Sequence, residues 1–288
     1  MNKIAMKVAM FCIAIACAIY SGRGINPAFT TSITIADVIN SSHTSRSINL
    51  EQYFQQLGIE GSIIIYDAQN EKSYQHNPQR NQTAFLPTST FKILNSLISL
   101  ETGIIDDEIA VLTWDGIPRL IPEWNRDLNM RQAFEFSAVW FYQVLARKVG
   151  HDRMQTLVSQ SNYGNQNIGS KEDIDTFWLT GDLRITPQQQ IDFLRRLHDN
   201  DLPFSERTLS IVKDIAIVEQ TPEYTIRAKT GAIGFGDETQ QQIGWYVGYL
   251  ERGKDVYFFA TNIDLEDESD LAARIKVTRL CFQELKLL

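Results

Sequence analysis

Residues 86–93 read LPTSTFKI, and they place Lys92 in the first turn of an otherwise apolar segment. The residues that follow have the spacing of a buried helical stripe: Leu94, Leu97, Ile98 and Leu100. No acidic residue occurs between Ala84 and Leu100. A charged side chain is costly to bury unless it is paired or neutralised. Ser89, three residues before Lys92, suggests how this lysine could be used.

The Ser89–Lys92 spacing places a hydroxyl and an amine on the same face of a helix. A neutral lysine there could take the serine's proton and make the serine a nucleophile. Ser89 also follows Pro87, as expected where a helix starts and its free N–H groups can stabilise an oxyanion. The same pattern recurs at Ser210–Lys213, but an acid follows that lysine directly, so a solvated helix explains the second copy.

Two further tripeptides along the chain offer groups that could take part in serine acyl transfer. Ser137-Ala138-Val139 precedes an apolar helix, WFYQVLARKVG at 140–150. Ser137 is either the N-cap of that helix, the simpler interpretation, or a proton relay. Lys229-Thr230-Gly231 ends the alternating strand TIRAKTG at 225–231, and it supplies a cation, a hydroxyl and a bare backbone. An extended amide with a carboxylate could lie along that strand.

Strand patterns lie near both ends of the chain. Ser62–Asp67 (SIIIYD) reads as a buried strand, which Ser73–Gln75 could pair with. After Tyr224 come three more strands, at 225–231, 243–251 and 255–263, and the last two are joined as a hairpin through Arg252-Gly253-Lys254. The closing segment shows one amphipathic helical stripe: Leu271, Ile275, Thr278, Phe282 and Leu285.

A mainly helical block, roughly 88–220, separates these strands. Its clearest helix begins at Thr186, where Pro187 fits the first helical position and Gln189 completes a capping box. The sequence therefore predicts an α+β fold: an antiparallel sheet formed from both chain ends and flanked by helices, with an inserted helical lobe. A cleft between sheet and lobe is the expected place for chemistry.

The N-terminus has the pattern of a secretory leader. Met1–Lys7 contains two lysines and no acid, Val8–Tyr20 is almost entirely apolar, and small residues overlap and follow. Val8–Tyr20 is short for a membrane span, which needs roughly 17 to 25 residues. We expect a signal peptide at 1–22, with its cut site undetermined, and a single catalytic domain at 23–288. These features predict export to the periplasm, with no membrane insertion after the leader is removed.

Composition argues against several classes of function. The net charge of −8 and the pI of about 5.1 do not fit a protein that binds nucleic acid. The four histidines are isolated, which argues against a metal centre and a Ser-His-Asp triad. Two of the three cysteines lie in the leader, so Cys281 is expected to be a small buried hydrophobic residue without a disulfide partner.

The ordered motifs resemble those of the serine β-lactamases and penicillin-binding proteins, the penicillin-recognising serine enzymes. They are Ser89-Thr90-Phe91-Lys92, Ser137-Ala138-Val139, Tyr163-Gly164-Asn165 and Lys229-Thr230-Gly231. The specific resemblance is to class D, the oxacillinase type, because class A would carry Ser-Asp-Asn at the second motif. Four flanking stretches look like class D as well: TWDG (113–116), FWL (177–179), GWYVGYLE (244–251) and FFATNID (258–264).

The resemblance implies a secreted β-lactam hydrolase that confers resistance to penicillin-type antibiotics. In class D the motif lysine, here Lys92, reacts with carbon dioxide and becomes an N-carboxylated general base. Burial lowers a lysine's pKa and leaves the neutral amine that this reaction needs. By the family pattern Trp178 donates its indole N–H to the carbamate and Val139 shields it. No metal or other cofactor is implied besides carbon dioxide or bicarbonate.

The resemblance also assigns roles in the catalytic cycle. Carbamylated Lys92 deprotonates Ser89, which attacks the β-lactam carbonyl, and later activates the water that releases the acyl group. The backbone N–H groups of Ser89 and Ala232 hold the oxyanion, and Ser137 passes a proton to the ring nitrogen. Lys229, Thr230 and Arg274 bind the substrate's carboxylate, beside Gly231.

Some residues depart from common family usage. Thr88 stands where alanine is more usual, and Ala232 stands where an aromatic residue is frequent, which leaves the substrate range open. Two alternatives remain at this point: a β-lactam-sensing receptor-like domain that is acylated without turnover, and a cell-wall peptidase, against which Trp178 and Ser137-Ala138-Val139 argue. Homodimers occur in this family, but the sequence indicates no contact surface. The expected partner is a small-molecule β-lactam.

Overall fold

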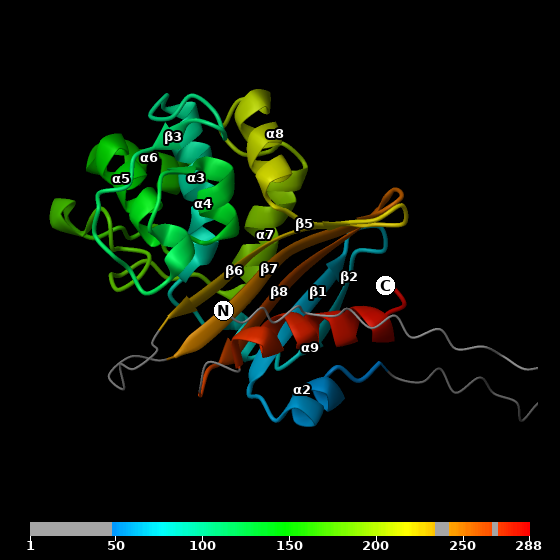
Figure 1. Ribbon diagram of the computed structural model, residues 1–288. Helices are drawn as coiled ribbons and strands as arrows, with labels where there is room; N and C mark the ends of the chain where they lie inside the picture. The colour runs from blue at the N-terminus through cyan, green and yellow to red at the C-terminus, as the bar shows by residue number, and fades with distance from the viewer. Residues whose placement is uncertain (1–47, 234–241, 267–269) are drawn as a thin grey trace, which may run out of the picture. The chain divides into compact units, whose positions relative to one another are not determined.

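Six strands form one antiparallel sheet in the order β2-β1-β8-β7-β6-β5 (Figure 1). Their bounds are β1 (Gly61–Asp67), β2 (Lys72–His76), β5 (Ile217–Gln220), β6 (Thr225–Ile233), β7 (Ile243–Arg252) and β8 (Asp255–Asp264). Strand β1 from the beginning of the chain pairs with β8 near its end. The sheet is therefore built from both chain ends, as predicted. The computed structural model describes residues 48–233, 242–266 and 270–288, so the predicted leader lies outside the described residues.

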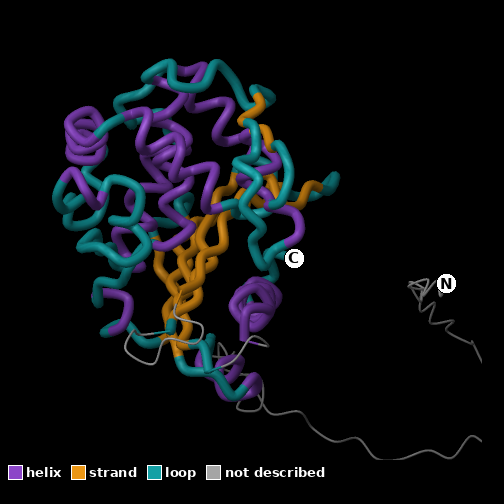
Figure 2. Tube along the Cα trace, turned by 60° about the vertical axis from the view of Figure 1, so that its left-hand side comes forward, coloured by secondary structure: helices purple, strands orange, loops and turns teal. Residues whose placement is uncertain are grey.

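Helices cover both faces of the sheet (Figure 1). One face carries α2 (Glu51–Leu57) and α9 (Asp270–Glu284). The other carries the helical lobe, which contains α3 (Lys92–Glu101), α4 (Met130–Glu135), α5 (Val139–Val149), α6 (His151–Gln160), α7 (Pro187–His198) and α8 (Glu206–Ile215). Figure 2 shows the strands as a layer between this lobe and the two terminal helices. The α+β architecture predicted from the sequence is confirmed.

Short elements complete the described chain. They are the 3₁₀ turns η1 (Arg80–Gln82), η2 (Thr88–Phe91), η3 (Pro122–Trp124) and η4 (Lys171–Asp173), and a small two-stranded sheet of β3 (Val111–Leu112) and β4 (Leu128–Asn129). No helix among the described residues has the length and apolar character needed to span a membrane.

The sheet separates two hydrophobic cores because alternate residues of a strand point to opposite faces. In β1, Ile64 belongs to the core under the helical lobe, whereas Ile63 and Ile65 face α2 and α9. In β7 the same alternation sends Val247 to the lobe and Tyr246 to the terminal helices. Because both faces are covered, the strands read as nearly continuous apolar runs.

Local sequence chemistry sets the start of α7 as predicted. Thr186 is the N-cap, Pro187 occupies the first turn, and the Thr186 hydroxyl accepts the N–H of Gln189 at 3.0 Å. The Gln189 side chain accepts the N–H of Thr186 in return, also at 3.0 Å. The residues expected to face the core are buried: Ile191, Leu194 and Leu197.

The buried face of α9 differs from the predicted stripe. Thr278 and Phe282 are buried as expected, but Leu271 and Ile275 are only half-buried. The buried seam is made instead by residues 277, 278, 281 and 282, and it includes Cys281. Thr278 can lie against the sheet because its hydroxyl is hydrogen-bonded to Thr261 at 2.6 Å and to the Arg274 carbonyl at 2.7 Å.

The pairing of β5 leaves half of β6 with a free edge. Strand β5 pairs with the first residues of β6, Thr225–Arg227, and Ala228 then donates its N–H to Ala216. From Lys229 to Ile233, β6 pairs with β7 on one side, and no described strand lies on the other side. The turn that carries Ser89 packs against this part of β6.

Candidate active site

The η2 turn and the first residue of α3 bring Ser89 and Lys92 together. The Lys92 amine donates to the Ser89 hydroxyl oxygen at 2.7 Å. Lys92 is completely buried, whereas Ser89 is 8% exposed. The serine oxygen is therefore the end of this pair that a substrate can reach, and the amine lies behind it.

The surroundings of Lys92 favour its neutral form. Burial is the main cause that lowers its pKa well below the ordinary value of 10.5, and the positive charge of Lys229 adds to the effect. Its amine lies 5.4 Å from the centre of the Tyr142 ring. Among the described residues, no carboxylate forms an ion pair with it. A neutral amine can accept a proton or attack an electrophile, and both abilities suit a base beside a nucleophile.

Trp178 packs behind the Ser89 turn with an unused hydrogen-bond donor. Its carbonyl accepts the N–H of Thr88 at 3.0 Å, and its ring stacks on Phe91 with centroids 5.4 Å apart. The indole N–H is buried and has no hydrogen-bond partner among the described residues. A buried donor without an acceptor is costly. The site therefore has a place for an oxygen acceptor that the described part of the chain does not supply.

The turn between α4 and α5 carries Ser137 in a left-handed conformation, with φ of 57°. The N-cap of α5 is Ala138, and no side chain caps this helix. The structure thus excludes the interpretation of Ser137 as an N-cap. Val139 is the first residue of α5 and is half-buried.

Lys229 is the second lysine of the site, and it is also buried, with 4% of its surface exposed. Its amine lies 5.4 Å from the Phe134 ring centre and donates to the Thr230 carbonyl at 3.2 Å. Burial, followed by the charge of Arg274, lowers its pKa to about 7. Thr230 is half-buried beside it on β6.

Gly231 allows β6 to lie directly against the Ser89 turn. A Cβ atom at this position would overlap the Thr88 hydroxyl and stand 3.3 Å from both the Pro87 carbonyl oxygen and the Ser89 nitrogen. The close approach explains why a residue without a side chain follows Lys229 and Thr230. It places the free edge of β6 beside the serine.

Arg274 reaches the same edge from α9. Its guanidinium donates to the Gly231 carbonyl at 2.8 Å, and burial lowers its pKa to about 10. Arg279, one turn further along, instead pairs with Glu219 at 2.5 Å. The structure therefore brings the predicted arginine to the site and leaves the other outside it. Ala232, half-buried, pairs with Gly244 of β7 at the end of this edge.

A cavity of about 500 Å³ lies next to Lys229 and Thr230. Its walls include parts of α4, the end of α8, β5 and β6, with Phe134, Ile215 and Val218 among its apolar residues. A cavity of this size is in the range that holds small-molecule ligands. Among the described residues, no group of three histidines, cysteines or acids could hold a metal ion.

The second Ser-x-x-Lys copy has a different arrangement. Ser210 is exposed on α8. The Lys213 amine donates to the His198 carbonyl and the Asn200 side chain, both at 2.7 Å, and so joins α8 to the end of α7. Its contacts are structural and belong to a different part of the lobe.

Tyr163-Gly164-Asn165 forms a turn that supports the Ser89 segment. Gly164 has φ of 55°, and Asn165 donates its N–H to the Arg184 carbonyl at 2.8 Å. The Tyr163 ring packs edge-on against Phe91, with centroids 5.7 Å apart. This agrees with its interpretation as a structural turn near the site.

Several site features carry no signal in the sequence. Tyr142 and Phe134 lie beneath the two buried lysines, yet each reads as an ordinary core aromatic residue. Thr88 adopts φ of 52° with its hydroxyl buried and unpaired among the described residues, although nothing in LPTSTFKI marks a left-handed position.

Comparison with known proteins gives a consistent result. The sequence model of the family described as "Penicillin binding protein transpeptidase domain" matches residues 61–283. The chain is 40% identical to "Beta-lactamase OXA-5" of Pseudomonas aeruginosa over 251 residues, which cover 87% of this chain and 93% of that protein. It is 39% identical to "Beta-lactamase OXA-48" of Klebsiella pneumoniae over 236 residues, which cover 82% and 87% of the two chains.

Solved structures show the same relationship. A class D β-lactamase YbXI from Nostoc is 58% identical with a TM-score of 0.82, and the alignment covers 84% of this chain and all of that one. FUS-1 (OXA-85), a class D β-lactamase of Fusobacterium nucleatum subsp. polymorphum, is 36% identical with a TM-score of 0.79 over 83% and 98% of the two chains.

Proposed function

The chain belongs to the class D serine β-lactamases, and from that premise we propose that it hydrolyses β-lactams through an acyl-enzyme on Ser89, with carbamylated Lys92 as the general base. The observation that carries the proposal is the buried, carboxylate-free Lys92 amine at 2.7 Å from the Ser89 oxygen. Its lowered pKa favours the neutral form, and its position allows it to act on that hydroxyl.

The indole N–H of Trp178, which has no partner among the described residues, supports carbamylation of Lys92. The neutral amine would form an N–C bond to carbon dioxide and lose a proton to solvent, which gives an anionic carbamate. The unpaired indole N–H of Trp178, packed on the turn that joins Ser89 to Lys92, offers a donor for one carbamate oxygen. Val139 would limit access of water to the modified side chain.

In the proposed acylation step, Ser89 gives its proton to carbamylated Lys92 and its oxygen attacks the β-lactam carbonyl. The N–H groups of Ser89 and Ala232 would stabilise the oxyanion, because the free half of β6 lies against the Ser89 turn. Ser137 would deliver a proton to the ring nitrogen as the C–N bond breaks. The proton held by carbamylated Lys92 would replace the one that Ser137 gives up, which restores the base. Carbamylated Lys92 would then take a proton from the water that attacks the ester and return it to the Ser89 oxygen as the acyl group leaves.

Three cationic or hydroxyl groups would hold the substrate's carboxylate. Lys229, Thr230 and Arg274 converge on the same end of β6, and the Arg274 guanidinium already lies 2.8 Å from the Gly231 carbonyl. A substrate anion there would favour the charged form of Lys229, whose pKa is about 7 in its absence. Binding would therefore be accompanied by proton uptake near neutral pH.

We further propose that the chain is exported to the periplasm by residues 1–22 and protects its host from penicillin-type antibiotics. The β-lactamase relatives and the leader-like sequence support this assignment. Antibiotic susceptibility of a host that expresses the chain, with and without residues 1–22, tests both statements.

Turnover of a chromogenic cephalosporin tests the enzymatic proposal, with Ser89→Ala as the inactive control. We expect many substrate molecules to be opened per protein, and mass spectrometry to find the acyl group on Ser89. A receptor-like sensor would instead stop after one equivalent. Hydrolysis of a D-Ala-D-Ala peptide in place of the β-lactam would indicate a cell-wall peptidase.

A further inference from the structure

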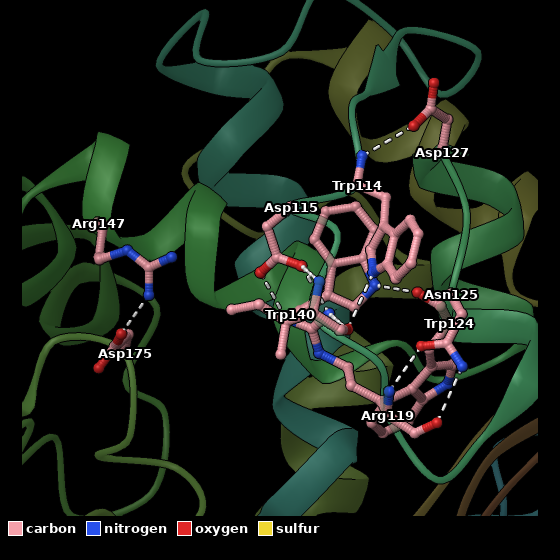
Figure 3. Close-up of polar contacts among 10 residues, drawn as sticks. Trp114, Asp115, Arg119, Trp124, Asn125, Asp127, Trp140, Arg147 and Asp175 are labelled. Carbon is pink, nitrogen blue, oxygen red and sulfur yellow. Dashed lines mark hydrogen bonds and ion pairs between the residues drawn. The ribbon is translucent and has the colours of Figure 1, made fainter.

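Two tryptophan side chains fasten the loop at residues 113–127 to the start of α5 (Figure 3). The Trp124 indole N–H donates to the Phe136 carbonyl at 2.9 Å. The Trp140 indole N–H donates to the Trp124 carbonyl, also at 2.9 Å. Trp140 is 3% exposed and Trp124 is half-buried, so this bond is partly shielded from water. The Trp140 bond joins α5 to the loop, and the Trp124 bond joins the loop to the peptide immediately before Ser137.

That peptide is held at both of its polar ends. Trp124 binds its carbonyl, and the Ser137 N–H donates to the Phe134 carbonyl at 3.2 Å. The next N–H, from Ala138, donates to the Ala133 carbonyl at 2.8 Å. Ser137 itself has φ of 57°, which residues other than glycine rarely adopt. The hydrogen bonds on both sides therefore maintain a backbone conformation that an unrestrained serine would leave.

The loop that carries Trp124 is also closed on itself. Asp115 and Arg119 form a two-pronged ion pair at 2.9 and 2.7 Å, and the guanidinium lies 5.6 Å from the Trp140 ring centre (Figure 3). The Arg119 backbone exchanges two hydrogen bonds with Asn125, at 2.7 and 2.9 Å. The loop therefore presents Trp124 to the Phe136 carbonyl from a fixed frame.

We propose that Trp124 and Trp140 are positioning residues for Ser137: they preset the backbone of its turn and so aim its hydroxyl at the ring nitrogen of the substrate. The inference rests on the proposed function, in which Ser137 acts during acylation. Release of the acyl group uses Lys92 and water instead. The two tryptophans therefore control the rate of acylation and leave the rate of deacylation unchanged.

Trp140→Phe tests the inference because it keeps an aromatic ring and removes the indole N–H, together with part of the buried ring system. Rapid mixing with a penicillin separates acylation from deacylation. We expect acylation to slow by about 3- to 10-fold, the effect of one ordinary hydrogen bond, and deacylation to stay unchanged. Trp124→Phe is expected to behave alike. The matched control is Arg147→Gln, on the same helix as Trp140, which breaks an ion pair with Asp175 from another segment and is expected to change neither rate (Figure 3).

A double-mutant cycle distinguishes positioning from general support of the fold. If Trp140 acts through Ser137, Trp140→Phe slows acylation in the wild-type chain but causes no further loss in Ser137→Ala. An equal loss in both backgrounds overturns the inference, and so does a lower Tm with unchanged acylation. If Trp140→Phe does not fold, Trp124→Phe, whose ring is half-buried, is taken through the same cycle. A wild-type chain that is never acylated on Ser89 refutes the proposed function before any variant is compared.

Discussion

At the scale of single residues, two lysines follow a serine by three positions, and their surroundings give them different chemistry. Lys92 is buried beside Ser89 and has no carboxylate partner within the described residues, whereas Lys213 donates to two oxygens near the end of α7. We expect Lys92→Ala to lower turnover by about 10²- to 10⁴-fold, the range for loss of a general base. Lys213→Ala should leave turnover nearly intact. Steady-state hydrolysis of a penicillin measures both.

The melting temperature serves as the control for this pair of variants. Lys213→Ala removes two hydrogen bonds between α8 and the end of α7, so it should lower Tm and leave kcat nearly unchanged. If Lys213→Ala lost turnover and Lys92→Ala kept full activity, our account would have placed the chemistry on the wrong segment of the chain.

The pH dependence of activity follows from the lowered pKa of Lys92. Burial depresses that pKa and so favours the neutral amine, the form that the proposed carbamylation needs. Acid protonates the amine and drives carbon dioxide off, so activity should fall as the pH is lowered. Added bicarbonate should restore it at moderately acidic pH. Initial rates at several pH values, with and without bicarbonate, measure the effect.

The control for the bicarbonate experiment is an enzyme that cannot stabilise the carbamate. Trp178→Phe removes the unpaired indole N–H and keeps the ring on Phe91. It should need more bicarbonate than the wild-type chain to reach half of its maximal rate. Equal bicarbonate dependence in the two proteins would show that this N–H does not bind the carbamate.

At the scale of elements, the contact between β6 and the Ser89 turn depends on Gly231. A methyl group there would overlap the Thr88 hydroxyl and press on the turn, and overpacking of this kind costs about 1 to 3 kcal/mol. Gly231→Ala should therefore lower kcat/KM and Tm together. Steady-state kinetics and thermal unfolding measure the two losses.

A second substitution checks the cause of that loss. Thr88→Ala removes the atom nearest to the added methyl group, so Thr88→Ala/Gly231→Ala should regain part of the stability that Gly231→Ala loses. The Pro87 carbonyl and the Ser89 nitrogen, both 3.3 Å away, would still limit the recovery. Additive effects of the two substitutions would mean that the Thr88 hydroxyl is not the obstacle.

Elements with local signals were predictable from the sequence, and contacts across the fold were not. The capping box at Thr186 and the β-branched run before Asp67 fixed a helix start and a strand. The buried face of α9 was only partly predicted, because it depends on contacts with the sheet. The Thr278 hydroxyl is hydrogen-bonded to Thr261 on β8, so Thr278 and Cys281 lie on the buried side of the helix. No pattern within residues 270–284 reveals that partner.

The site shows the same division. The Ser-x-x-Lys spacing predicted the contact between Ser89 and Lys92, and the strand that carries Lys229-Thr230-Gly231 lies against their turn. The depth at which Lys229 is buried, and the φ of Ser137, depend on Phe134 and Trp124, which read as ordinary aromatic residues. Such features are set by packing between distant segments, and the sequence gives them no local mark.

At the scale of the whole molecule, two buried lysines make stability depend on pH. The pKa of Lys229 is about 7 in the folded chain and about 10.4 when unfolded. Between these values the unfolded state binds a proton that the folded state lacks, so the free energy of unfolding should rise with pH, by up to about 1.4 kcal/mol per pH unit for each such group. Below pH 7 both states bind the proton and the cost of burying the charge is fully present. Lys92, whose pKa is lowered too, acts in the same direction.

Urea unfolding between pH 7 and about 8 in carbon dioxide-free buffer measures this slope, because above that range the buried Cys281 thiol, whose pKa is raised to about 12, acts in the opposite direction. That window stays below the titration of the buried tyrosines, whose raised pKa values have the opposite effect at higher pH. Lys229→Met should flatten the slope by about one proton. An unchanged slope in that variant would show that Lys229 is charged in the folded protein throughout the window.

The seam between α9 and the sheet has a further consequence through its thiol. Cys281 is 0% exposed, and burial raises its pKa to about 12, so the folded chain should resist alkylating reagents. Once residues 1–22 are removed, no other cysteine remains. The rate at which iodoacetamide labels the protein without residues 1–22 would then report how often α9 separates from the sheet, and no probe would have to be attached.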